Sequence, residues 1–224
     1  MLTAEQKQNC VHVSEELLER YRHDPAKFIS QLVTQDETWI HHFDPESKQQ
    51  SMQWKHVESP PPKKFKVCAS AGKVMASVFW DSQGVIMIDY LEQGKTITGD
   101  YYASLLVKLR DAIKDKRRGK LRNGVLLLHD NARSHSSRIA VASAKQCGFE
   151  LLPHPSYSPD LAPSDFYLFP ELKENIRGQV FDSDYDVMSA VDTWLHDQDR
   201  VFYEHGLKQL EKRWQNVLIF MVIM

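Results

Sequence analysis

The most constraining feature of this sequence is the apolar run Val125–Leu128, which is followed at once by His129 and Asp130. Four consecutive branched apolar residues between polar segments are typical of a short strand that is buried on both faces. A carboxylate directly after such a strand lies at the edge of the sheet, where ligands bind in open α/β folds. The run therefore predicts an α/β protein with Asp130 at a sheet edge.

Helix and strand patterns alternate along the rest of the chain. A capping box at Thr3 and Gln6 begins a first helix that ends at Pro25. β-Branched and aromatic residues predict a strand over 31–43 and a hairpin over 74–92. Later segments predict further helices and strands: helices over 102–113, 136–146 and 166–176 and around 187–195 and 207–214, and strands over 125–128 and 150–152. Strands come first, strands then alternate with helices, and helices end the chain.

A polar stretch over residues 44–70 separates the first strand from the hairpin. It contains Pro60, Pro61 and Pro62, and proline cannot donate a ladder hydrogen bond, so the stretch is not a central strand. It predicts a long protruding loop.

Composition limits the class of protein. The 224 residues, 42% of them hydrophobic, can bury the core of one domain, with or without an appendage. Because 28 basic residues face 30 acidic ones, nucleic-acid binding has to come from local patches. Cys10, Cys68 and Cys147 are odd in number and far apart, which argues against a disulfide framework and favours a reducing compartment. The first residues do not resemble a signal peptide, and the apolar end 217–224 is too short to cross a bilayer.

Three aspartates stand where a core element meets a loop: Asp36, Asp130 and Asp165. Mg²⁺ and Mn²⁺ prefer carboxylate oxygens, and two such ions about 3.5–4 Å apart can clamp the attacking and leaving oxygens of a displacement at phosphorus. Each residue also has an ordinary interpretation. Asp165 fits a favourable charge at a helix start, and Asp130 fits a turn. Asp36 fits a solvated strand residue, and its neighbour Glu37 could take its place in the site.

The stretches VTQDETWIHHF (33–43), LLLHDNARSH (126–135) and LLPHPSYSPDLAPSDFYLF (151–169) resemble the catalytic domain of mariner-type transposases of the mariner/Tc1 superfamily. Residues 131–164, a stretch of 34, separate Asp130 from Asp165, as in the DD34D triad of that family. The similarity runs from about Leu2 to Val217. Ser134 departs from it, because the family usually has proline there.

The resemblance implies a ribonuclease H-like mixed sheet flanked by helices, with a long clamp-like loop insertion after Phe43. It divides the chain into a helical lead-in over 1–30, the catalytic domain over 31–217 and a divergent tail over 218–224. It makes Asp36, Asp130 and Asp165 the ligands of two Mg²⁺ or Mn²⁺ ions per active site. The implied activity is metal-dependent cleavage of DNA, followed by attack of the freed 3′-hydroxyl on target DNA, with no nucleophilic Ser, Tyr or Cys.

Residues around Asp130 are further candidates. His129, Asn131 and His135 either contact DNA, orient a metal ligand, or serve as turn and packing residues. A zinc site from His129, His135 and His154 lacks cysteines and a matching spacing.

A basic run follows the helix over 102–113, and a smaller group lies in the proline-containing stretch. If the resemblance supplies DNA, their side chains are candidates for phosphate contacts, although a charge run is usually a solvated surface. The two sets are Lys114, Lys116, Arg117, Arg118, Lys120 and Arg122, and Lys63, Lys64 and Lys66.

The family also carries paired helix-turn-helix domains ahead of this core, which we expect this chain to lack. The expected partner is therefore DNA, with a homodimer left open, no membrane, no small-molecule substrate and a nuclear location. Two alternatives compete with an active transposase core. One is a catalytically idle DNA-binding or dimerisation module, and the other is a nuclease for RNA–DNA hybrids.

Overall fold

The computed structural model describes residues 2–46 and 68–222 of the chain. Most of the predicted protruding loop, including Pro60–Pro62 and the three lysines at 63, 64 and 66, lies outside these ranges, so the clamp-like insertion stays a prediction.

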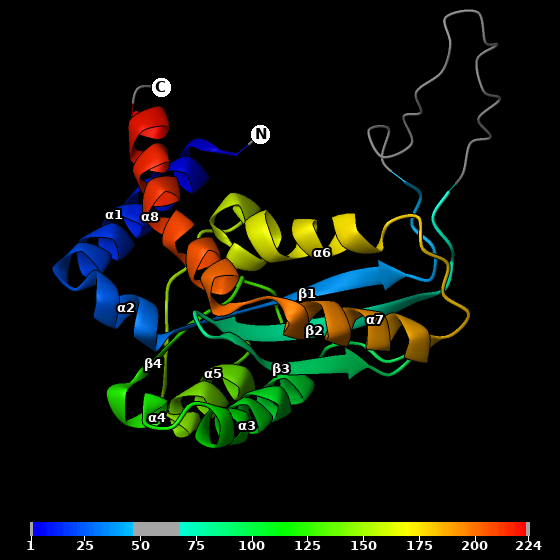
Figure 1. Cartoon of the computed structure of the whole chain (residues 1–224). Helices are drawn as coiled ribbons and strands as arrows, with labels where there is room; N and C mark the ends of the chain where they lie inside the picture. Colours follow the sequence, from blue (N-terminus) through cyan, green and yellow to red (C-terminus); the bar gives the residue numbers. More distant parts are fainter. Residues whose placement is uncertain (1, 47–67, 223–224) are drawn as a thin grey trace, which may run out of the picture.

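The described chain folds into a five-stranded sheet with helices on both faces (Figure 1). The strands are β1 (Leu32–His41), β2 (Lys73–Asp81), β3 (Gly84–Leu91), β4 (Val125–Leu128) and β5 (Phe149–Leu151). The helices are α1 (Ala4–His23), α2 (Pro25–Gln31), α3 (Gly99–Lys116), α4 (Lys120–Asn123), α5 (Arg138–Cys147), α6 (Phe169–Ile176), α7 (Asp184–Asp197) and α8 (Arg200–Val222). Two short turns precede α6, the 3₁₀ turn η1 (Pro159–Leu161) and the π-helical turn η2 (Ser164–Leu168).

The sheet is mixed. Its strand order is β3-β2-β1-β4-β5, with β1, β2 and β3 antiparallel and β1, β4 and β5 parallel. The predicted strand–hairpin unit and the later alternation of strand and helix therefore join at β1, which pairs with both halves. The predicted α/β class is confirmed.

Alternate residues of the strands enter two separate cores. Leu32, Trp80 and Leu126 face the layer of α1, α6, α7 and α8, whereas Val33 and Leu127 face α3 and α5. In Figure 1, α6 lies above β1 and α7 crosses in front of β2 and β3, whereas α3 and α5 lie below the sheet. Successive side chains of β4 point to opposite faces of the sheet, and both faces are buried. This explains why the β4 run has no polar residue.

The first and last helices pack on each other. Thr3 caps α1 through the predicted capping box, and Asp24 then caps α2, so Pro25 starts a second helix where the sequence predicts only an end. The rings of Tyr21, Phe28 and Trp214 meet edge to face with centroids 5.7–6.2 Å apart. Helix α8 continues to Val222, past the predicted start of the divergent tail at 218.

The basic run that begins in the last turn of α3 is partly turned inward. The buried carboxylate of Asp81 accepts a hydrogen bond from Arg117 Nε and pairs with Lys120 Nζ, both at 3.0 Å. Lys120 also donates to the carbonyls of Ser30 and Leu32. These bonds tie the β2–β3 turn to α4 and to the start of β1.

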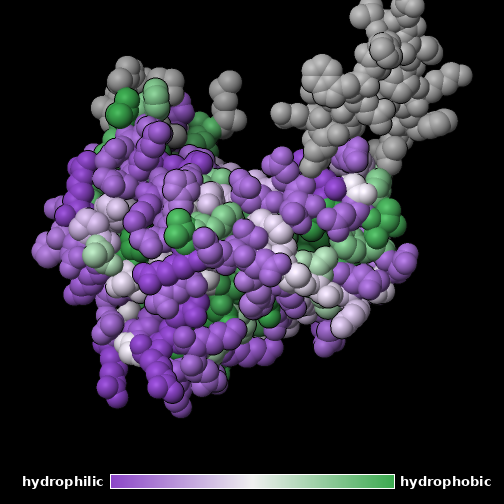
Figure 2. Space-filling model, viewed as in Figure 1, coloured by the Kyte–Doolittle hydropathy of each residue, from purple (hydrophilic) through white to green (hydrophobic). Residues whose placement is uncertain are grey.

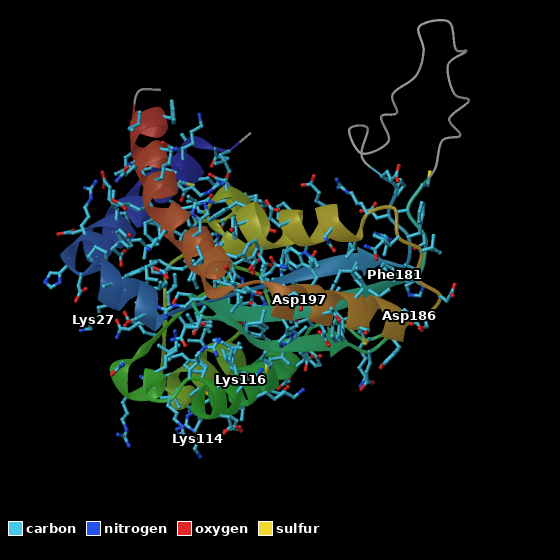
Figure 3. The ribbon with its side chains drawn as sticks, viewed as in Figure 1. Lys27, Lys114, Lys116, Phe181, Asp186 and Asp197 are labelled. Carbon is cyan, nitrogen blue, oxygen red and sulfur yellow. The ribbon has the colours of Figure 1, made fainter. Side chains whose placement is uncertain are left out.

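This network corrects part of the phosphate-contact prediction. Lys120 and Arg117 form ion pairs with Asp81, and Lys116 donates a hydrogen bond to the carbonyl of Ile86. Lys116 lies toward the sheet and Lys114 at the outer edge (Figure 3). Because both side chains are already bonded to a buried carboxylate, the structure argues against phosphate contacts by Arg117 and Lys120. Phosphate contact stays a prediction for Lys114, Lys116, Arg118 and Arg122, which are exposed.

The visible surface is mainly hydrophilic, with apolar side chains in small groups (Figure 2). Across residues 2–46 and 68–222, no helix combines the length and the apolar character needed to cross a membrane.

Replacing Asp81 by alanine should lower the free energy of unfolding by about 3–5 kcal/mol, because it leaves the buried Lys120 and the partly buried Arg117 without their carboxylate. Glu92→Ala removes one side of an exposed pair with Lys95 and should cost at most about 1 kcal/mol. Urea denaturation of the two variants measures both values. Equal losses would show that the buried network contributes no more than a surface pair.

Candidate active site

Parallel pairing of β1 and β4 brings two of the predicted aspartates together. Thr34 of β1 lies opposite Leu128 of β4. Asp36 stands two residues beyond Thr34, and Asp130 stands two residues beyond Leu128. Because side chains alternate along a strand, both carboxylates reach the same end of the sheet, on the face that α6, α7 and α8 cover.

Asp165 comes to this end from another layer. It lies in the π-helical turn η2, whose neighbour Ser164 accepts a 3.0 Å hydrogen bond from Trp80 Nε1 of β2. Such turns are rare inside helices and are frequent at functional sites. The predicted helix start at Asp165 is thus an irregular turn that is fastened directly to the sheet.

The carboxyl groups of Asp36 and Asp165 interact strongly. Burial and, next in size, the nearby charge of Asp165 together raise the pKa of Asp36 to about 8. Burial also raises the pKa of Asp165, together with the charge of Asp130, while a hydrogen bond with Asp36 opposes the rise. Without a cation, the site therefore disfavours ionisation of both groups, since like charges at short range repel.

The contacts of Asp130, in contrast, favour its ionised form. Its carboxylate accepts hydrogen bonds from Ala132 N at 2.9 Å and from His135 Nδ1 at 2.7 Å. Burial alone would raise the pKa of Asp130, but these two bonds outweigh it and lower the pKa. The other ring nitrogen of His135 bonds to Glu37 Oε1 at 3.1 Å. Burial tends to lower the pKa of His135, but the two carboxylates raise it to about 9, so the ring is a cation between Asp130 and Glu37.

The histidines next to Asp130 have packing roles that the sequence left open. His135 is only 1% exposed and its ring bonds to Asp130, so the ring lies beneath the surface that DNA could reach. His129 stacks on Tyr102 and shares a 2.8 Å hydrogen bond with its hydroxyl group. Burial and the charge of His135 lower the pKa of His129 to about 3, so this ring is neutral. The Asn131 side chain donates to the His154 carbonyl, which joins two loops beside the site.

Glu37 is the residue whose role the sequence did not assign. It follows Asp36 directly and accepts from Gln35 Nε2 at 2.7 Å as well as from His135. A separation of 98 residues between Glu37 and His135 leaves no local signal for this pair. The only signal in the sequence was that Glu37 is acidic and directly follows Asp36.

The donor set fits a hard divalent cation. Among the described residues, no three acidic, His or Cys side chains form a ready-made cage for an ion. Mg²⁺ does not require one, because it is usually held by one or two carboxylates with waters and substrate phosphates. The raised pKa values of Asp36 and Asp165 record a repulsion that such a cation would relieve. A zinc site is disfavoured, because both nitrogens of His135 are occupied.

Known proteins share this architecture. The solved catalytic domain of the Mos1 mariner transposase matches with a TM-score of 0.82 and 31% identity, covering 99% of this chain and 96% of that one. The chain belongs to the mariner-type transposases. It is a catalytic domain of that family, and the predicted ribonuclease H-like fold is confirmed.

A family match and longer relatives agree with this assignment. The family described as "Transposase (partial DDE domain)" matches residues 44–123. The Mos1 transposase of Drosophila mauritiana is 34% identical over 96% of this chain, and the human histone-lysine N-methyltransferase SETMAR is 34% identical over the same share. The chain spans 61% of the first protein and 31% of the second. A Mos1 paired-end complex with Mn matches with a TM-score of 0.90 at 32% identity, covering 99% of this chain and 64% of that one.

Asp36→Asn should stabilise the cation-free domain, and more so at high pH. The folded pKa of Asp36 is raised, so the native state gains stability from this group below its ordinary pKa and loses it as the pH rises toward about 8. The asparagine does not titrate, so its advantage should grow to roughly 1–3 kcal/mol at pH 8. Urea denaturation in EDTA at pH 5 and pH 8 measures this, with the exposed Asp197→Asn as a control that should show no such growth.

Proposed function

We propose that this domain cleaves DNA strands and transfers the freed 3′ end to target DNA, using two Mg²⁺ or Mn²⁺ ions held by Asp36, Asp130 and Asp165. The observation that carries the proposal is the meeting of these three carboxylates from β1, the end of β4 and η2 at one sheet edge. When bound, the ions would activate the attacking oxygen and stabilise the leaving one.

The protein side chains supply position and charge. His135 and Ala132 N fix the orientation of Asp130 from behind, which leaves its other oxygen free for a ligand. Asp36 is buried, whereas Asp165 and Asp130 are open enough for DNA oxygens to complete the coordination. Structures of Mos1 with Mn, with Mg and with a transposon end support this use of the shared site.

The proposal extends to partners and place. Lys114, Arg118 and Arg122 are exposed cations that can contact DNA phosphates. The Mos1 paired-end complexes support binding of DNA, and we extend the proposal to a homodimer of the domain on that DNA. Sequence-specific recognition of transposon ends would need a helix-turn-helix region beyond the matched core, and a chromosomal DNA substrate would place the protein in the nucleus.

Nicking of supercoiled plasmid tests the function. The purified domain should nick the plasmid with Mg²⁺ or Mn²⁺ and not with EDTA. Asp130→Asn and Asp165→Asn should each lower the rate at least about 100-fold, the typical cost of a lost or misplaced reacting group. Asp197→Asn, exposed at the end of α7, should keep the parent rate (Figure 3).

Two results would contradict this function. If the folded domain and its Asp variants nick equally or not at all, the domain is an idle DNA-binding or dimerisation module. If only RNA–DNA hybrids are cut and the RNA 2′-hydroxyl is required, it is a ribonuclease.

His135 should act as a positioning residue for Asp130. His135→Asn removes the cation that aligns this carboxylate, so the affinity for Mn²⁺ should fall by about 10- to 100-fold. Isothermal titration with Mn²⁺ measures the change, and the exposed His196→Asn is the matched control. Unchanged Mn²⁺ affinity in a folded His135 variant would show that the contact serves packing alone.

A further inference from the structure

A groove continues from the carboxylates along the surface. Its volume is about 500 Å³, and Asp130 and Asp165 are among the residues that line it. The walls are the segment after Asp130 and the loop over 154–162. A volume of this size falls in the range of sites that hold small organic molecules, and its position makes it the natural extension of the active site.

Tyr157 stands out in the wall of this groove. Its φ is +59°, and it is the single described residue other than glycine with a positive φ. The residue is nonetheless 78% exposed, so burial of the ring does not offset the strain. A bulky residue in this conformation costs roughly 1–3 kcal/mol, and such strain collects at binding sites. An asparagine or glycine would hold the turn more easily.

The loop that carries Tyr157 is rigidly supported. The hydroxyl group of its neighbour Ser158 is buried and lies 3.3 Å from Cys10 Sγ of α1. On the other side, the Asn131 side chain bonds to the carbonyl of His154, and Pro155 is buried. The aromatic ring is therefore presented to solvent from a preorganised backbone, which lowers the entropy lost on binding.

Arg133 supplies the positive charge of the groove. It is exposed, and among the described lining residues it is the single arginine or lysine. No ion pair involves it within residues 2–46 and 68–222. His154 adds no cation, because burial lowers its pKa. An unpaired guanidinium beside two carboxylates suits a ligand that carries phosphate.

We propose that this groove binds one nucleotide of the DNA strand next to the phosphate that reacts, with its base stacked on Tyr157 and its backbone phosphate on Arg133. The inference rests on the proposed function, because it takes the strand that the carboxylates would act on. Stacking on an aromatic ring accepts every base, so Tyr157 adds affinity without sequence preference. The groove would thereby position the strand without any contact that reads its base sequence.

The two contacts predict different signatures in binding. Affinities are measured by fluorescence anisotropy, in EDTA at low ionic strength, for a short labelled oligothymidylate and an abasic strand of equal length. Tyr157→Asn keeps the positive φ and removes the ring. It should weaken binding of the oligothymidylate by about 5- to 100-fold and leave binding of the abasic strand unchanged. Arg133→Gln should weaken both strands equally and lower the salt dependence by about one phosphate contact.

Control variants keep the test specific. Tyr157→Phe retains the ring and should bind like the parent, and Tyr185→Ala, which removes a 77% exposed tyrosine on α7, should also leave both affinities unchanged. Tyr157→Asn should not lower the melting temperature, because asparagine tolerates positive φ. Equal affinity of Tyr157→Asn and parent for the oligothymidylate would overturn the proposal, and so would equal losses on both strands.

The outcome separates the two hypotheses. A base-dependent loss in Tyr157→Asn with no plasmid nicking by the parent domain would support the groove as a nucleotide site and reject the cleavage function. Normal nicking by the parent with unchanged oligothymidylate binding in Tyr157→Asn would do the reverse.

Discussion

The parallel pairing of β1 with β4 determines where the chemistry of this domain can occur. Thr34 and Leu128 lie opposite each other, and the two aspartates two residues farther on share one end of the sheet as a result. A slip of one residue in this pairing would move Asp36 to the face of α3 and α5, away from η2. The apolar residues around it prevent the slip, because Leu32 and Val33 would both exchange cores.

The sequence predicted those parts of the site that depend on local pattern. The run at 125–128 is apolar on both faces, so its burial and the position of Asp130 at its end followed directly. Asp36 was recognisable as part of a strand, but its partner strand was not. Asp165 could be assigned only through the family resemblance, because a proline-rich turn does not reveal that its next residues form a π-helical turn bonded to Trp80.

Contacts between distant segments explain what could not be predicted. Lys120 belongs to a run of charges that looks solvated, and only the fold reveals that its ammonium group pairs with the buried Asp81. In the same way, His135 meets Glu37 across 98 residues, and Tyr157 sits in a segment whose Ser, Pro and Asp residues indicate a turn but not its strain. For Lys120 and His135 the missing information was a tertiary neighbour, and for Tyr157 it was the backbone conformation of a single residue. The near-neutral composition also gave no sign that some basic side chains form ion pairs inside the protein, or that three carboxylates gather at one end of the sheet.

The packing of α1 on α8 joins the two ends of the chain into one structural unit. Tyr21, Phe28 and Trp214 share a single aromatic cluster, so neither terminal helix buries its apolar face without the other. Regions that are linked in this way open together and share one local stability. The beginning and the end of the described chain are thus a single cooperative element, and fraying at one end exposes the other to proteolysis at the same moment.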